Sequence, residues 1–515
     1  MKRWKWLLCI LVLASATSGY AHVGSPDVYA EGQAGAYKML VVLRPPLVIP
    51  GVAEIEVRTE SPVVDSITIT AMPLTGEAAK HPPVPDTMQK PTRDAQFYVG
   101  HLWIMSAGSW QVRFVANGKY GEGILSIPLP ATATITQSMH KGLGTLLAIL
   151  GTALLIGMVR IVEAASTEAM LIPGQVRSAK DTRRGRVAMA IASLALMVAV
   201  ISGNHWWTVD AAEYAGNIYK PLEMASTLEE GNLLDLKLRD PDWFRPRSMD
   251  DFIPDHNHEM HLYAIRWPEM DVLFHLHPEP TGTGEFRLAL PSMPAGDYRI
   301  YADVVHASGF PETLVSELTI PTVHGLPLRG DDAEGKALPI TSGAATRKRE
   351  SAAGAAKQCT ADRRFTLPDG YTMIWRTLAP QIPKQSEIFR FELLDPEGKP
   401  PRDVALYMGM LGHAAFVKSD GSVFAHVHPD GTMAMAAMTM ANSNASINDQ
   451  SHPNAVDTGT MLGMDMDMVS SGRPNTVSFP YGFPSPGLYR IIVQMKHGDT
   501  IETGVFDADV PMSTP

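Results

Sequence analysis

The chain has 515 residues and an ordinary apolar content, which is enough for three or four domains with their own cores. Its formal charge is −11 at pH 7, and this acidity argues against nucleic acid as a partner. The only cysteines in the sequence are Cys9 and Cys359, which excludes a disulfide framework and iron–sulfur chemistry.

The amino terminus is typical of a secretory signal over residues 1–21. Lys2, Arg3 and Lys5 precede an apolar run, and residues 19–21 form a small-residue cleavage site. Cleavage after residue 21 would make His22 the first residue of the mature chain. Its α-amino and ring nitrogens would then form a chelating pair, so His22 is a candidate metal ligand. The alternative is that the cleavage position has no chemical meaning.

Residues 22–138 are predicted to form an outer β-sandwich domain. Apolar runs at 39–43 and 53–57 alternate with turn signals such as Pro45-Pro46. The stretch 108–114 begins with a Gly-x-aromatic-x-apolar pattern that recurs twice further along the chain. This domain is therefore interpreted as a distant relative of two later domains, without their histidines.

Two apolar stretches follow, and we predict transmembrane helices at 143–160 and 187–207. Leu143 to Val159 and Val187 to Asn204 contain no charged residue, and each is long enough to cross a membrane as a helix. The loop at 161–186 is rich in arginine, so the positive-inside rule places it in the cytoplasm. Together with the signal, this puts both large portions of the chain in the periplasm, anchored to a bacterial inner membrane. The alternative is two buried helices of a soluble domain.

Two further outer β-sandwich domains are predicted at 210–323 and 361–515, joined by a linker at 324–360. Both carry the same histidine pattern. A single histidine is followed by a His-x-His-Pro pair, then by a Gly-x-Tyr-Arg-Ile strand and a last histidine. The corresponding residues are His261, His275, His277 and His306 in one copy, and His413, His426, His428 and His497 in the other.

Histidines at positions i and i+2 of a strand point to the same face, about 7 Å apart, so each pair could converge on one metal ion. We predict one metal site in each domain, built from its four corresponding histidines. His256 and His258 are additional candidate ligands in the earlier copy. His275 and His277 are expected to face solvent. The alternative is that these histidines cap strands and satisfy backbone groups.

The predicted metal is copper, as Cu(I), Cu(II) or both. His256 and His258 correspond to Met408 and Met410 in the later copy, and imidazole and thioether are both copper ligands. Zinc is disfavoured because it has no use for thioethers. An insertion at 432–475 adds methionines that we expect in a polar loop with no core to fill, namely Met433, Met435, Met438, Met440, Met461, Met464, Met466 and Met468. The alternative for this insertion is a tether or a flexible contact surface.

The segment from Pro254 to Pro278, and its later counterpart ending in Gly421 to Pro429, resemble bacterial YtkA-like domains. The first domain, with His22 after the signal, is loosely similar to the CopC type of periplasmic copper-binding sandwich. The resemblance covers about half of the chain, and the His-x-His-Pro pairs are its most specific part. It implies immunoglobulin-like domains, three in all, and copper handling. The fusion of several copies around a membrane hairpin departs from the family pattern.

These patterns predict a membrane-anchored periplasmic copper-binding protein that serves copper homeostasis, resistance or delivery to a cuproenzyme. Its partners would be the inner membrane and a copper chaperone, pump or oxidase. Two other classes stay open: a copper-dependent oxidase-type enzyme, and a metal-free envelope interaction or sensor module. The sequence contains no nucleophile elbow, zinc-protease helix motif or phosphate loop, which makes an enzyme the less favoured class.

Overall fold

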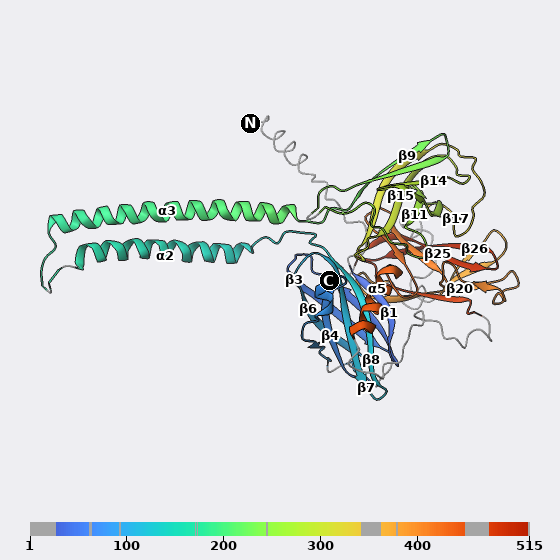
Figure 1. Cartoon of the computed structure of the whole chain (residues 1–515), viewed down its shortest axis with the longest axis horizontal. Coiled ribbons are helices and arrows are strands. Elements are labelled where there is room, and N and C mark those ends of the chain that lie inside the picture. Colours follow the sequence, from blue (N-terminus) through green and yellow to red (C-terminus); the bar gives the residue numbers. More distant parts are fainter. Residues whose placement is uncertain are drawn as a thin grey trace, which may run out of the picture. The chain divides into compact units, whose positions relative to one another are not determined.

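The computed structural model describes residues 27–60, 64–91, 94–169, 171–172, 174–243, 246–340, 362–376, 380–448 and 473–512. The predicted signal, His22, Cys359 and the second half of the methionine-rich insertion lie outside these ranges. Within them the chain is mainly β, with several antiparallel sheets and two long apolar helices (Figure 1). The predicted mainly-β class with a helical pair is confirmed. The chain divides into two compact units, Met1–Thr132 with Lys220–Pro515, and Ala133–Tyr219.

Two helices make up most of the unit Ala133–Tyr219. They are α2 (Lys141–Glu168) and α3 (Ala179–Gly216), which lie side by side (Figure 1). α3 begins with a capping box between Ser178 and Asp181. At 1.5 Å per residue, α2 extends about 42 Å, more than the roughly 30 Å of a hydrocarbon core. Both helices are long and apolar enough to cross a membrane, and their apolar windows are uncovered in the described structure. Both are longer than predicted, so the loop between them is shorter.

The first β domain, residues 27–132, consists of two four-stranded antiparallel sheets. One sheet has the order β1 (Val28–Ala34), β2 (Tyr37–Arg44), β3 (Gly51–Thr59) and β6 (Phe97–Ile104). The other has the order β5 (Asp86–Thr87), β4 (Val64–Pro73), β7 (Gly108–Gly118) and β8 (Gly121–Ala131), and η1 (Glu77–Lys80) is a short 3-10 helix. In β3 the apolar Ala53, Ile55 and Val57 are buried and alternate with polar residues, which is typical of a strand covered on one face.

The second β domain, residues 220–340, consists of a four-stranded and a five-stranded antiparallel sheet around a shared core. The smaller sheet has the order β13 (Glu279–Gly282), β14 (Glu285–Ala289), β10 (Leu233–Arg239) and β9 (Glu223–Glu229). The larger has the order β16 (Pro311–Ile320), β15 (Gly296–Val305), β11 (Met260–Arg266), β12 (Val272–Leu276) and β17 (Ala333–Lys336). Leu234 and Leu236 of the first sheet share a buried core with Leu262 and Phe274 of the second. β17 comes from the predicted linker, and α3 continues to Gly216, past the predicted start of this domain.

The third β domain, residues 362–512, repeats this arrangement. One sheet has the order β18 (Arg363–Thr366), β19 (Thr372–Arg376), β20 (Glu387–Leu394) and β24 (Thr476–Tyr481). The other has the order β21 (Val404–Ala405), β25 (Gly487–His497), β22 (His413–Lys418) and β23 (Phe424–Val427), and β26 (Thr500–Val510) pairs with β25. Trp375 and Phe391 of the first sheet share a core with Phe416 and Tyr489 of the second.

The two copies carry the same turn ahead of their first histidine strand. Asp255 and His258 form an isolated bridge around His256 and Asn257, whose φ angles are 50° and 72°. Tyr407 and Met410 form the same bridge around Met408 and Gly409, with φ angles of 50° and 82°. Two consecutive positive φ values are typical of a type I′ turn. The structure thus places Met408 and Met410 at the turn positions that His256 and His258 occupy.

The second and third β domains pack against each other through the outer faces of their histidine-bearing sheets. Tyr263 and Tyr301 of the second domain share a buried apolar cluster with Phe424 and Ile492 of the third, and the Tyr301 and Phe424 rings stack at 4.4 Å. Contacts at equivalent positions are reciprocal. His275 Nδ1 lies 2.9 Å from Gln494 Oε1. The counterpart of His275 is His426, whose Nδ1 lies 3.4 Å from Oδ2 of Asp303, the counterpart of Gln494. Reciprocal contacts indicate an approximate two-fold relation between the two domains.

The first half of the methionine-rich insertion is a helix, α5 (Met435–Asn448). Its Ala437 and Ala441 pack with Leu74 of the first β domain, and Met433 and Met438 are only 5% and 3% exposed. The expectation that these methionines have no core to fill is therefore wrong for this part of the insertion. Met461 to Met468 lie outside the described residues.

The segment just before α5 also attaches the third domain to the first. Glu31 donates its backbone N–H to Asp430 O, and Thr432 N–H donates to Tyr29 O, both at 2.9 Å. The Tyr29 ring lies in the core of the third domain against Tyr481. The segment before α5 is therefore held by the first β domain as well as by the third.

Candidate metal centre

Histidines from both copies meet at the interface between the second and third β domains. β11 explains how they reach it. Leu262 and Ala264 point into the core of the second domain, whereas His261, Tyr263 and Ile265 lie on the opposite face, which the third domain covers. The histidines in mutual ring contact are His256, His258, His261, His275, His277, His413, His426 and His428. We call this set the histidine cluster.

The expectation that His275 and His277 face solvent is wrong. His275 is fully buried and His277 is 8% exposed. The reason is that the sheet face carrying them is not an outer surface of the protein, because the third domain packs on it.

A first trio of the cluster comes from the second domain, with candidate ligand atoms of His261, His275 and His277 within 4.8 Å of one another. His261 Nε2 lies 3.0 Å from the Asp255 carbonyl oxygen, which can only accept, so Nε2 carries the hydrogen. His275 Nδ1 donates to Gln494 Oε1 at 2.9 Å, and His277 Nδ1 donates to Asp332 Oδ1 at 3.0 Å. Each imidazole thus uses its outer nitrogen as a donor and turns an unprotonated nitrogen towards the other two.

The inner nitrogens of this trio have no hydrogen to share. His261 Nδ1 and His275 Nε2 lie 3.2 Å apart, and two lone pairs cannot form a hydrogen bond. Two nitrogens that each lie about 2.0 Å from a tetrahedral ion are separated by about 3.3 Å. His277 Nε2 is buried and has no hydrogen-bond partner in the described part of the chain. The observed spacing therefore suits ligands of one cation.

A second trio joins residues of both domains, His256, His413 and His428, again with candidate ligand atoms within 4.8 Å of one another. His428 Nδ1 donates to the Met433 carbonyl at 3.0 Å, which leaves Nε2 unprotonated. Among the described residues, neither that Nε2, nor His256 Nε2, nor either ring nitrogen of His413 has a hydrogen-bond partner. The sequence predicted one site in each domain. Here His256 of the second domain instead joins two histidines of the third.

Two histidines complete the cluster. His426 Nε2 is a further buried nitrogen without a partner in the described structure, while its Nδ1 faces Asp303 at 3.4 Å. The His426 ring lies 5.3 Å from that of His261 and 4.6 Å from that of His428, so it contacts both trios. His258 stacks on His277 at 3.9 Å, and its Nε2 lies 3.2 Å from Asp331 Oδ2.

Burial favours the neutral form of six imidazoles of the cluster. It lowers the pKa of His277 and of His428 from 6.5 to about 3, with further lowering by the neighbouring His258 and His256. Burial and neighbouring histidines also lower the pKa values of His261, His275, His413 and His426 well below 6.5. A metal ligand must be neutral imidazole, so the cluster is poised to accept a cation at neutral pH.

His306 lies apart from the cluster, although the sequence grouped it with His261, His275 and His277. Its Nδ1 lies 2.7 Å from Asp251 Oδ1, and its Nε2 lies 3.3 Å from Glu312 Oε2, which also pairs with Arg247. Burial alone would lower the pKa of His306, but the hydrogen bonds to Glu312 and Asp251 raise it. Both ring nitrogens are engaged by carboxylates, which indicates a structural ion-pair network.

His497 occupies the equivalent position in the third domain and also lies apart from the cluster. Its Nε2 is 3.1 Å from Glu502 Oε1, and its ring stacks on Tyr371 at 4.0 Å. His497, Glu502 and Asp369 form a separate group that could hold a metal ion. Met408 and Met410 are buried, at 7% and 8% exposed.

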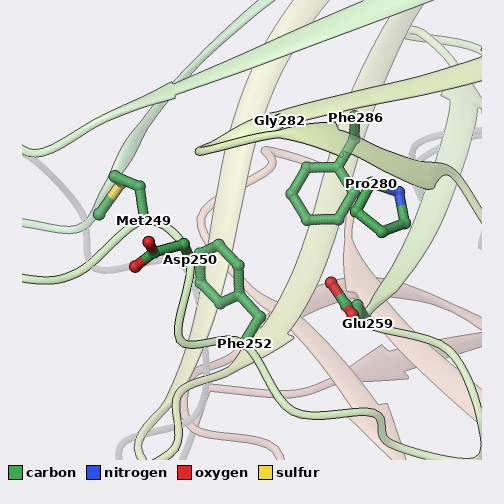
Figure 2. Close-up of a pocket in the computed structure, with 7 residues that line it drawn as sticks. All are labelled: Met249, Asp250, Phe252, Glu259, Pro280, Gly282 and Phe286. Atoms are coloured by element: carbon green, nitrogen blue, oxygen red, sulfur yellow. The ribbon is translucent and has the colours of Figure 1, made fainter.

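A cavity of about 250 Å³ lies in the second domain (Figure 2). Phe252 and Phe286 form two of its walls, and the carboxylates of Asp250 and Glu259 lie at its sides (Figure 2). None of the cluster histidines is among its lining residues. It is therefore a feature separate from the metal centre.

Sequence reasoning missed the residues that orient the imidazoles. These are Asp255, Asp303, Asp332 and Gln494, together with Tyr407, whose hydroxyl donates to Asp331 O at 2.7 Å and lies 3.2 Å from His275 Nδ1. A signal for two of them was present, because Asp303 and Gln494 each stand three residues before the last histidine of their copy. Such outer partners fix the orientation of metal-binding histidines.

Comparison with known proteins gives little beyond the third domain. A family described as a domain of unknown function (DUF8832) matches residues 366–512, and no curated protein matches the chain. Among solved structures, the chain is similar to a tetra-tandem repeat in the extending region of a large adhesion protein, with 8% identity, 90% of this chain and 71% of that chain covered, and a TM-score of 0.16. It is also similar to dimeric latent PorU from Porphyromonas gingivalis (8% identity, 94% and 34% covered, TM-score 0.15) and to the BSP domain of a biofilm associated protein (9%, 96% and 82%, 0.13). At such TM-scores these similarities carry no argument.

Proposed function

We propose that the chain is a membrane-anchored protein of the bacterial envelope that binds copper in the histidine cluster between its second and third β domains. One observation carries the proposal. Buried imidazoles from both domains turn unprotonated nitrogens towards one another, and the Nε2 atoms of His256, His277, His426 and His428 have no hydrogen-bond partner in the described part of the chain.

Energetics favour a cation in this position. A buried polar atom without a partner costs about 1–3 kcal/mol, and six ring nitrogens of the cluster are in that state among the described residues. Buried polar groups in folded proteins nearly always have a partner, so a concentration of unpartnered nitrogens at one place calls for a compensating interaction. A bound cation would compensate five of the six, because each ring has one unprotonated nitrogen whose lone pair would then donate to the metal, whereas the second nitrogen of His413 carries its hydrogen. The outer acceptors on His261, His275, His277 and His428 already hold those rings in a ligand's orientation.

The donor set favours copper among the cations. The inward-facing donors are imidazoles, which suit copper, zinc, iron and nickel, and Cu(II) binds most tightly in the divalent series. Cysteine is absent from the cluster, and the nearby carboxylates face outer ring nitrogens as hydrogen-bond acceptors. The resemblance of the His-x-His-Pro segments to YtkA-like domains adds weight to copper and to an immunoglobulin-like form for the β domains.

Anchoring and location rest on the helical unit. α2 and α3 have the length and composition of membrane spans. The arginines near the start of α3 favour a cytoplasmic loop, which would leave the β domains in the periplasm. The predicted signal over residues 1–21 supports the same orientation.

Burial of the ligands suggests how the protein would use copper. An ion held beneath two packed sheets exchanges slowly unless the domains separate. This favours retention of copper for homeostasis or resistance, with delivery to a cuproenzyme, chaperone or pump coupled to opening of the interface. In this role the protein would be a binding protein rather than an enzyme.

Metal analysis of the purified full-length protein tests the proposal. After loading with Cu(II) or Cu(I) and desalting, the wild type should retain copper, and His275→Ala combined with His277→Ala should lose at least half of it. His324→Ala is the matched control, because His324 is an exposed histidine of the same domain. Loading with Zn(II) in parallel identifies the preferred metal. Wild-type protein that retains no copper, or the same amount as the double variant, contradicts the proposal.

A further inference from the structure

We propose that the histidine cluster holds two metal ions next to each other, one in each trio, with His256 supplied by the second domain to the ion of the third. This rests on the proposed copper binding and goes beyond it, because it fixes the number of ions and assigns each its own ligands.

The number of inward-facing nitrogens requires the second ion. A mononuclear site for copper or zinc uses three or four protein ligands. The two trios share no residue, and each brings its candidate ligand atoms within 4.8 Å. An ion bound by His261, His275 and His277 would leave His428 Nε2 and the unprotonated nitrogen of His413 buried and without a partner among the described residues. A second ion in the other trio would compensate both.

The two ions would be neighbours rather than isolated centres. The His256 ring of the second trio lies 6.2 Å from the His261 ring of the first, edge to face. The centre of the His426 ring lies 5.6 Å from the ring centres of both His275 and His413, so the same imidazole contacts a member of each trio. Its Nε2 is buried without a partner in the described ranges, which makes it the fourth ligand available to either ion. The two proposed ion positions are therefore separated only by imidazole rings of the cluster.

The two trios depend differently on the interface between the second and third β domains. The first trio comes entirely from the second domain, although Gln494 of the third domain orients His275. The second trio needs His256 from across the interface. It can therefore form only when the two domains are docked, so that ion would also strengthen the docking, as binding to the native state always does.

Stoichiometry and electron paramagnetic resonance of the copper-loaded full-length protein test the proposal. Wild type should hold two Cu(II) per chain and show magnetic interaction between them, as a half-field line or as fewer observable spins than bound ions. His256→Asn should hold one Cu(II) per chain with an isolated one-spin signal. Asparagine is chosen because it tolerates the positive φ of 50° at this position. His277→Ala should give the complementary one-ion protein, and His324→Ala should match wild type.

Each outcome is decisive. One copper per chain in wild type, or two copper ions with the full signal of isolated spins, overturns the two-ion centre while leaving copper binding intact. Wild-type protein that binds no copper overturns the proposed function itself. If His256→Asn is poorly folded by circular dichroism, His413→Gln removes another ligand of the same trio and should give the same one-ion result.

Discussion

Acid should separate the second and third β domains in the metal-free protein. The docked interface buries neutral imidazoles, and separation exposes them to water, where each can take up a proton. A histidine whose pKa is depressed in the docked state stabilises docking fully above its ordinary pKa of 6.5. That contribution is lost as the pH falls below 6.5 towards the docked value.

The size of the effect follows from the two residues with the most defined shifts. Burial holds the pKa of His277 and of His428 near about 3, against an ordinary value of 6.5. At pH 5, which is 1.5 units below 6.5, each therefore weakens docking by about 2 kcal/mol, and the pair by about 4 kcal/mol. The other buried histidines of the cluster act in the same direction. A loss of this size is comparable with the whole stability of many domains, about 5–15 kcal/mol.

Thermal unfolding and small-angle X-ray scattering of chelator-treated protein at pH 7.5 and pH 5 would measure this. We expect a lower first melting midpoint and a larger radius of gyration at pH 5. Combining His277→Gln with His428→Gln should reduce the pH dependence of the unfolding free energy by about 4 kcal/mol, whereas His324→Gln should leave it unchanged. The reasoning is refuted if wild type and the double variant respond equally to the change from pH 7.5 to 5.

Three other predictions concern parts of the fold outside the cluster. Arg247→Met leaves the buried Glu312 carboxylate without its guanidinium partner and should cost about 3–5 kcal/mol in the unfolding free energy of the second domain, seen by calorimetry. Burial raises the pKa of Glu387 from 4.5 to about 7, so its contribution is present below pH 4.5 and lost as the pH rises through 7; Glu387→Gln should therefore raise the melting midpoint at pH 8 and not at pH 4. A cysteine replacing Lys180, in a Cys359→Ser background, should react with a membrane-impermeant maleimide only after the membrane is opened, and reaction in intact cells would contradict the proposed orientation.

The histidine pattern could be predicted from the sequence because it is local. The His-x-His spacing and its repetition identify strand faces that carry imidazoles, and the matching turns at His256 and Met408 place the two copies in register. The domain classes could be predicted for the same reason, since alternation of apolar residues along strands such as β3 reports one covered face.

The meeting of the two copies could not be predicted from these local patterns, because it depends on which sheet faces pack together. A partial signal was present in β11, because Leu262 to Ile265 form a continuous apolar run, and the structure buries every residue from Met260 to Ile265. Its outward residues Tyr263 and Ile265 are apolar, as in a strand covered on both faces. The nature of α5 was missed for a similar reason. Its methionines suggested a polar loop, although alanines at 434, 437 and 441 already had a helical spacing.

The two-fold relation indicates which ion His256 and its counterpart Met408 each lie beside. His256 of the second domain lies beside His413 and His428 of the third, with ring separations of 4.9 Å to both. The same relation, applied in reverse, would bring Met408 of the third domain towards His261 and His277 of the second. We therefore predict that the ion bound by the second domain has Met408 as a thioether neighbour, whereas the imidazole of His256 takes the equivalent position at the ion bound by the third.

A soft thioether stabilises Cu(I), so the ion near Met408 should be the harder one to oxidise. Met408→Leu keeps the bulk of the side chain and removes the ligand, and should weaken Cu(I) binding at one of the two positions about tenfold, which is about 1.4 kcal/mol. Met408→His should make the positions alike, and histidine fits there because His256 has the same φ of 50° in the equivalent turn. Competition titrations with a Cu(I) chelator would measure both changes. Equal Cu(I) affinity in wild type and Met408→Leu would show that the sulfur only fills space at the interface.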